Sequence, residues 1–115
     1  MLMKHVFIFW LACSLGFLGC DRGPTVEITK TKAEAGDSEA QNDLGRMYFF
    51  GAGVGQDNIA AYAWTSLAET NGHAKARQNK GNIVRKMTPA QIVEAKELFQ
   101  KFQKLYDGNG TALSE

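Results

Sequence analysis

The sequence repeats itself with a period of 36 residues, and this constrains the fold more than any other feature of the chain. Shifting the chain by 36 positions superposes three pairs of small residues: Gly36 on Gly72, Ala40 on Ala76, and Gly45 on Gly81. Periods of this length are typical of helical arrays, in which each unit is an αα-hairpin that cannot bury its apolar face alone. The period therefore predicts an all-α fold, a short solenoid of stacked αα-hairpins.

Two helices are expected in the first unit. Asp37 is a suitable N-cap, apolar residues follow it at spacings of three and four, and Gly51 can end the helix in the left-handed conformation, which predicts a helix over about 38–50. Asp57 is a second N-cap, and the helix that follows it is expected to end before Gly72. Small side chains let the two axes approach closely, and large ones fill the space between them. The small residues are Ala40, Gly45, Ala61 and Ala68, and the large ones are Leu44, Tyr48, Trp64 and Leu67.

The segment between these helices, GAGVG at 51–55, raises the possibility of a phosphate-binding loop. Such a loop follows a strand and reads GxGxxG or ends in Gly-Lys-Ser/Thr, whereas this segment follows a helix and contains no lysine. We therefore expect a turn between helices. In it Gly51, Gly53 and Gly55 would supply positive φ angles, and Val54 would pack into the hairpin.

A second, degenerate unit is expected over 73–106. Its first helix is expected from about His73 to Lys86. Its second helix begins with a capping box, in which Thr88 is the N-cap and Gln91 the third helical residue, and an apolar stripe continues to Tyr106. This helix is expected to cap the open end of the solenoid, although the same stripe could instead be the seam of a homodimer.

The segment AGDSEAQNDLGRMYFFGAGVGQDNIAAYAWTSLAETNGHAKA resembles a Sel1-like repeat, which is similar to the tetratricopeptide repeat. The pattern runs AxxG, then A, LG, a Tyr, GxGV, D, A, W, A and G. The residues that fall on it are Ala33, Gly36, Ala40, Leu44, Gly45, Tyr48, Gly51, Gly53, Val54, Asp57, Ala61, Trp64, Ala68 and Gly72. The full repeat covers 33–72, and the second unit departs from it at Lys80, where a leucine is expected. The resemblance implies a scaffold or adaptor that binds another protein.

The first twenty residues have the layout of a secretory leader: a basic start at Lys4 and a largely apolar run of 13 residues from Val6 to Leu18. Their end, FLGC, resembles a bacterial lipobox, which implies a signal peptide at 1–19 and a lipidated Cys20. The alternatives are an uncleaved anchor and ordinary secretion. Residues 20–25 would then be a lipid-anchored tether, 26–106 the repeat domain and 107–115 a flexible tail, with a short leading helix at about 25–35.

This resemblance implies a location on the periplasmic side of a bacterial cell envelope. Asp21, directly after the lipidated residue, favours the inner over the outer membrane. The expected partners are therefore the membrane, through the lipid, and a protein that the sequence does not identify.

Charge argues against nucleic acid as a partner. The excess of one positive charge lies in the leader, so the rest of the chain is neutral, whereas phosphate binding requires a surplus of Lys and Arg. The charges are unevenly placed, with 4 basic and 8 acidic residues over 20–69 and 8 basic and 2 acidic residues over 75–104. Either the two halves are complementary solvated faces, or the basic half rests on anionic lipid headgroups.

The sequence predicts no catalytic residue, no metal site and no cofactor. His73 is the one histidine after the leader, and no nucleophile or metal-ligand motif accompanies it. An enzymatic alternative comes from cysteine-rich relatives of the Sel1-like repeat that have been linked to β-lactam binding or hydrolysis, but they carry paired cysteines and this chain does not. A further alternative is a structural envelope protein that self-assembles through its last helix.

Protein binding would use the first helix of each unit. Tyr48, Phe49 and Phe50 point about 100° apart on a helix, so one interface cannot bury all three. At least one phenylalanine is expected at the surface unless a neighbouring helix pair covers both. The residues expected to line a groove are Gln41, Asn42, Arg46, Phe49, Gln78 and Asn82.

Overall fold

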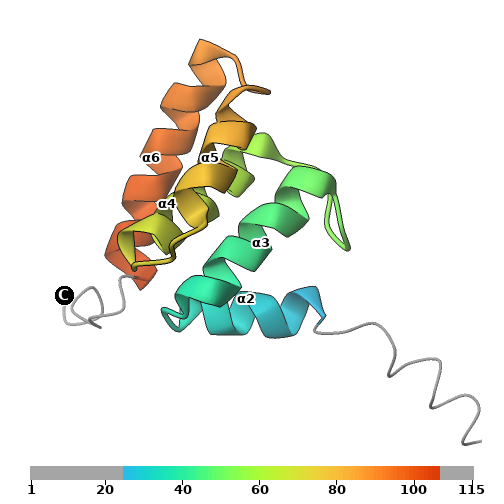
Figure 1. The fold of residues 1–115 in the computed structure, drawn as a ribbon, viewed down its shortest axis with the longest axis vertical. Coiled ribbons are helices and arrows are strands. Elements are labelled where there is room, and N and C mark those ends of the chain that lie inside the picture. Colours follow the sequence, from blue (N-terminus) through green and yellow to red (C-terminus); the bar gives the residue numbers. More distant parts are fainter. Residues whose placement is uncertain (1–24, 107–115) are drawn as a thin grey trace, which may run out of the picture.

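A computed structural model of the chain describes residues 25–106 (Figure 1). The described part contains five α-helices and no strand, which confirms the all-α prediction. The helices are α2 (Val26–Glu34), α3 (Ser38–Phe50), α4 (Asn58–Thr70), α5 (Ala76–Val84) and α6 (Pro89–Tyr106). The expected signal peptide, the lipidated Cys20 and the tail lie outside the described residues, as does most of the tether.

The helices form a short stack of hairpins rather than a closed bundle. In Figure 1, α3 and α5 run in the same direction, and α6 runs in the direction opposite to α5. Helix α4 is central, because α3, α5 and α6 all pack against it, while α2 packs mainly on α3. The fold is therefore two consecutive αα-hairpins, α3–α4 and α5–α6, preceded by the single helix α2.

The two helices of the first hairpin begin with the same cap. Asp37 Oδ1 accepts hydrogen bonds from the backbone N–H groups of Glu39 (3.0 Å) and Ala40 (3.4 Å). Asp57 Oδ1 accepts from Ile59 and Ala60 in the same way, at 2.9 and 3.1 Å. An aspartate at this position satisfies free N–H groups and adds negative charge at the positive end of the helix dipole. Both predicted N-caps are confirmed.

The 36-residue period is visible in the backbone as a pair of equivalent turns. Gly36 ends α2 with φ 98°, and Gly72 ends α4 with φ 91°. The residue after each glycine donates its N–H back across the turn, from Asp37 to Lys32 O (3.1 Å) and from His73 to Ala68 O (2.9 Å). Only glycine adopts such φ values without strain. Helix α2 therefore occupies the place that α4 has one unit later.

The close contact between α3 and α4 depends on Gly45. A β-carbon there would overlap Thr65 Oγ1 and would lie 3.1 Å from Ala61 O and 3.2 Å from Thr65 N. Gly81 holds the equivalent position in α5, and a β-carbon there would meet no atom within 4 Å. The two glycines therefore share a place in the repeat but not a packing role.

An aromatic cluster attaches α6 to α4. The Trp64 ring lies 4.4 Å from the Phe102 ring and 5.5 Å from the Tyr106 ring, centroid to centroid. Trp64 and Leu67 belong to the buried core, and Phe99 also packs against it. Phe99, Phe102 and Tyr106 of the apolar stripe of α6 thus cover α4, as expected of a capping helix.

The structure corrects two details of the prediction. Helix α5 begins at Ala76 and not at His73, because His73 and its neighbours belong to the turn that ends α4. In the turn after α3, Gly51 (φ 68°) and Gly53 (φ 78°) have positive φ angles, whereas Gly55 does not. Val54 is half-buried in this turn. The capping box at Thr88 is present: Gln91 N donates to Thr88 Oγ1 (3.2 Å), and Thr88 N donates to Gln91 Oε1 (3.0 Å).

Candidate protein-binding groove

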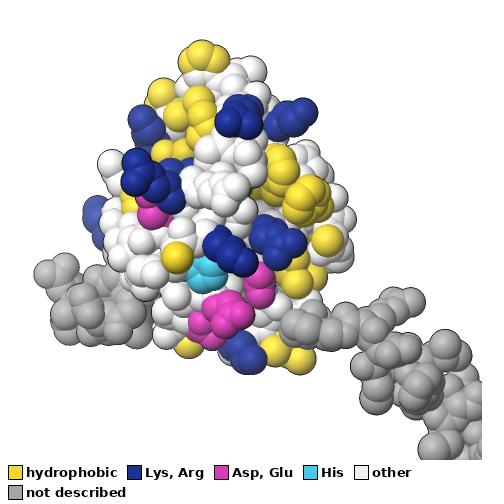
Figure 2. Space-filling view, in the orientation of Figure 1, with side chains coloured by type: hydrophobic (Ala, Val, Ile, Leu, Met, Phe, Trp, Pro, Cys, Tyr) yellow, Lys and Arg dark blue, Asp and Glu magenta, His cyan; other side chains and the backbone are white. Residues whose placement is uncertain are grey.

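A hollow of about 360 Å³ lies between α3 and α5, the first helices of the two hairpins. It combines aromatic, amide and cationic side chains. Its lining residues are Asn42, Arg46, Phe49, Phe50, Lys75, Asn79, Asn82 and Ile83. On this face, hydrophobic side chains gather over the C-terminal half of α3, with Lys and Arg side chains around them (Figure 2). We call this hollow the α3–α5 groove.

The last turn of α3 supplies the aromatic part of the groove. The rings of Phe49 and Phe50 meet edge to face, with centroids 5.0 Å apart. Phe49 is half-buried against the cluster that contains Ile83, so it packs on the next helix pair. Phe50 keeps 68% of its surface exposed. The structure therefore separates the two phenylalanines: one joins the hairpins and the other faces solvent.

Side-chain amides form the floor of the groove. Asn42 on α3 is 4% exposed, and its Oδ1 accepts a hydrogen bond from Asn79 Nδ2 on α5 (2.8 Å). This bond fixes the distance between the two helices at the groove. Asn79 was not among the residues expected from the sequence. Its spacing to Lys75 and Asn82 is four and three residues, so the helical period could have shown it once the start of α5 was known.

Four of the six residues expected in a groove line this hollow: Asn42, Arg46, Phe49 and Asn82. Gln78 lies instead in a neighbouring hollow with Arg77 and Arg85, which Asn82 also lines. Gln41 is fully buried and does not reach the groove surface.

Gln41 has a structural role in place of the expected binding role. Its Nε2 donates to Ala33 O at the end of α2 (2.9 Å), and its Oε1 accepts from Asn71 Nδ2 at the end of α4 (2.9 Å). A buried amide with both ends bonded avoids the cost of an unsatisfied polar group. Gln41 thereby joins three helices behind the groove.

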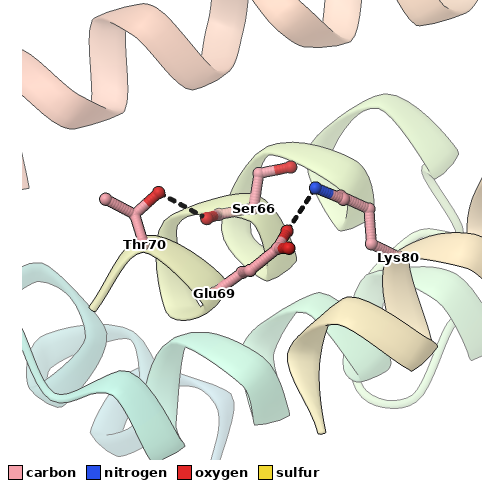
Figure 3. Close-up of polar contacts among 4 residues, drawn as sticks. All are labelled: Ser66, Glu69, Thr70 and Lys80. Atoms are coloured by element: carbon pink, nitrogen blue, oxygen red, sulfur yellow. Dashed lines mark hydrogen bonds and ion pairs between the residues drawn. The ribbon is translucent and has the colours of Figure 1, made fainter. Parts of the chain in front are cut away.

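The cations at the groove differ in how strongly other residues hold them. Arg46 lies 3.8 Å from Asp43 on its own helix, and both side chains are about half exposed, so this pair is weak. Lys75 forms no ion pair with any residue in 25–106. Lys80 instead pairs with Glu69 on α4, beside the hydrogen bond from Thr70 Oγ1 to Ser66 O (3.1 Å; Figure 3). Lys75 and Arg46 are therefore the cations available to a ligand.

The described residues contain no group of three or more His, Cys, Asp and Glu side chains that could hold a metal ion. His73 lies half-buried in the turn before α5, and its Nδ1 has no hydrogen-bond partner within residues 25–106. None of the helices in this range combines the length and apolar character that a bilayer crossing requires.

The arrangement of α3, α4 and the turn that follows α4 corresponds to a known repeat. The sequence model of the family described as Sel1 repeat matches residues 38–73. This segment is a Sel1 repeat. The matched segment begins at the first residue of α3 and ends one residue past Gly72, and it contains every core position of the α3–α4 hairpin.

A solved structure extends the likeness beyond the matched Sel1 repeat. The chain is similar to a protective antigen present in uropathogenic Escherichia coli strains, which displays an SLR fold, with a TM-score of 0.71 and 31% sequence identity. The similarity covers 76% of this chain and 19% of the antigen, so it spans about a fifth of the antigen's length. No curated protein matches the chain.

The positions shared with the Sel1 repeat lie in the core between α3 and α4. Leu44, Ala61 and Ala68 are fully buried between α3 and α4, and Trp64 is 4% exposed. These residues therefore form the contact between the two helices of the Sel1 repeat.

Proposed function

We propose that the protein is an adaptor that binds a protein partner through the α3–α5 groove. Sel1 repeats generally mediate protein–protein interaction. The groove is formed by the first helix of the Sel1 repeat and the first helix of the degenerate unit after it. The adaptor acts as a rigid surface, because Asn79 and Asn42 hold the two helices together at its floor.

The observation that carries this proposal is the exposure of Phe50. A phenylalanine that is 68% exposed leaves a large apolar area in water, although it lies beside a hollow lined by amides and cations. Aromatic residues next to polar groups are typical of the residues that contribute most to protein–protein binding. Burial of an exposed phenylalanine by a partner would contribute about 1.5–3 kcal/mol.

The proposal includes attachment to the periplasmic side of a bacterial membrane. It rests on the leader layout at 1–19 and on the FLGC segment that ends with Cys20. A tether over 20–25 would extend about 20 Å at most, at about 3.3–3.6 Å per residue. The repeat domain at 26–106 would then act on partners near the membrane surface, with the inner membrane favoured by Asp21.

Site-specific photocrosslinking in living cells tests the binding site. A benzoylphenylalanine in place of Asn82, which is exposed and lines the groove, should form a discrete covalent complex with another protein. The matched control carries the same group in place of Gln100, which is exposed on α6. The proposal predicts a complex from position 82 that is absent from position 100. Equal yields from both positions, or no complex from either, would refute it.

A further inference from the structure

We infer that the partner of the α3–α5 groove is an extended, acidic protein segment that carries a bulky apolar side chain. In this arrangement the apolar side chain contacts Phe50, and the carboxylates pair with Arg46 and Lys75. The inference rests on the proposed function and adds the chemistry of the partner to it.

Charge is the first argument for an acidic segment. Residues 71–93, which include all of α5, contain five Lys and Arg residues and no Asp or Glu. Lys80 is paired with Glu69, so it is already neutralised. Lys75 lines the groove, and Arg77 and Arg85 line the neighbouring hollow that shares Asn82 with it. The two hollows thus form one cationic surface along α5, and a negatively charged partner is complementary to it.

The amides are the second argument, because they favour a polypeptide over a simple anion. An asparagine side chain presents donors and an acceptor together. The backbone of an extended segment likewise presents N–H and C=O groups in alternation along its length. Asn82 is exposed at the boundary of the two hollows, where such a backbone would pass.

The third argument is the position of the aromatic pair. Phe50 lies at the end of α3, at the rim of the hollow. The ring of Phe49 meets it edge to face, with the two ring centroids 5.0 Å apart. A flat layer of anionic lipid headgroups would satisfy the cations, but it could not enter a concave floor of amides. A protein segment can contact the cations, the exposed amide of Asn82 and Phe50 at once, so we favour it over the membrane.

A peptide array tests the inference. The full-length chain, purified in detergent, is applied to ten-residue synthetic peptides of random sequence. Each selected peptide is compared with a copy in which Asn and Gln replace Asp and Glu. We expect the selected peptides to combine acidic residues with Phe, Leu or Trp. We also expect the amide copies to bind about four- to twenty-fivefold more weakly, since they lose the ion pairs with both Arg46 and Lys75 and each exposed pair contributes about a two- to fivefold effect.

Variants of the chain locate the contact. Arg46→Gln and Lys75→Gln should each weaken binding by about two- to fivefold, and Phe50→Ser should weaken it about tenfold or more. Lys101→Gln, on the exposed side of α6, removes the same charge far from the groove and should leave binding unchanged. All four side chains are exposed or half-exposed, so the variants should keep the thermal midpoint of the parent chain, which circular dichroism checks.

Three outcomes would overturn the inference. If the array selected neutral or basic peptides whose binding depends on Phe50 but not on Arg46, the partner would not be acidic, although the groove would remain the binding site. Binding to phosphatidylglycerol vesicles that depends on Arg46 and Lys75, with no acidic peptide selected, would favour the membrane. Failure of the array to yield any peptide would also overturn it. The crosslink at position 82 decides the proposed function independently of these results.

Discussion

Replacement of one glycine in each repeat unit tests the packing of this fold more sharply than any single change. Gly45 and Gly81 stand 36 residues apart at equivalent positions of α3 and α5, and both become alanine in the experiment. In a helix interior this change alone stabilises a protein by about 0.8–1 kcal/mol, because alanine is the better helix former. Any difference between the two variants therefore comes from their surroundings.

At Gly45 the surroundings oppose the new methyl group. It would overlap Thr65 Oγ1 and crowd two backbone atoms of α4, Ala61 O at 3.1 Å and Thr65 N at 3.2 Å. A side chain can rotate away, but the backbone of a helix packed on three others cannot move without cost. Overpacking of this kind costs about 1–3 kcal/mol, and contact with two backbone atoms points to the upper end. After the gain in helix propensity, Gly45→Ala should destabilise the chain by about 2 kcal/mol.

At Gly81 no atom lies within 4 Å of the new methyl group, so the propensity gain remains unopposed. Gly81→Ala should stabilise the chain by about 0.8–1 kcal/mol. For a domain of 60–100 residues, 1 kcal/mol shifts the thermal midpoint by about 4–8 °C. Thermal unfolding followed by circular dichroism should thus show Gly45→Ala about 8–16 °C below the parent and Gly81→Ala about 3–8 °C above it. If both variants shifted in the same direction, the account of the α3–α4 contact would be wrong.

Three further predictions follow from the same structure. Trp64→Ala removes the ring that contacts Phe102 and stacks on Tyr106, so urea unfolding should show a loss of about 3–5 kcal/mol. Val93→Ala, on the exposed side of α6, should cost less than about 0.5 kcal/mol. Asp57→Ala leaves the N–H groups of Ile59 and Ala60 without their acceptor, so urea unfolding should show a loss of about 1 kcal/mol. Asparagine caps a helix about as well as aspartate, so an equal loss from Asp57→Asn would argue against the cap. Cys20→Ser removes the sulfur that would carry the lipid, so the chain should move from the membrane fraction to the soluble fraction or keep its leader. Mass spectrometry of the N-terminus should find acyl chains on the parent alone, and an unmodified parent would refute the anchor.

Local signals were enough to predict most of the helices. Asp37, Asp57 and the Thr88–Gln91 pair each act within three residues of their own position, so their effect can be derived from the sequence without tertiary contacts. The start of α5 is different, because no side chain caps it. The backbone N–H of His73 donates a hydrogen bond to Ala68 O, so His73 belongs to the turn that ends α4. This bond depends on the backbone conformation at the end of α4 and not on the side chains near the start of α5.

The candidate site was predicted less completely, for a physical reason. Whether a polar side chain on a helix binds a partner or joins two helices depends on what packs beside it. Gln41 is buried because the end of α2 and Asn71 meet it, and the sequence contains no local sign of either contact. Arg46 and Asn82 stand 36 residues apart and both line the groove, whereas Asn42 lines it and its equivalent, Gln78, lies in the neighbouring hollow. A repeat fixes the axis of each helix more reliably than it fixes which of two adjacent side chains faces a groove.

Side-chain footprinting in native membranes tests the central claim, that a partner covers the α3–α5 groove, whatever the identity of that partner. Phe50, Val93 and Leu105 are three large apolar side chains with exposed fractions of 68%, 57% and 52%, and only Phe50 lies at the groove. Hydroxyl radicals should oxidise all three in the purified chain. In native envelopes we predict that Phe50 becomes protected while Val93 and Leu105 stay reactive. Equal oxidation of Phe50 in both samples, or protection confined to the two side chains of α6, would contradict the account.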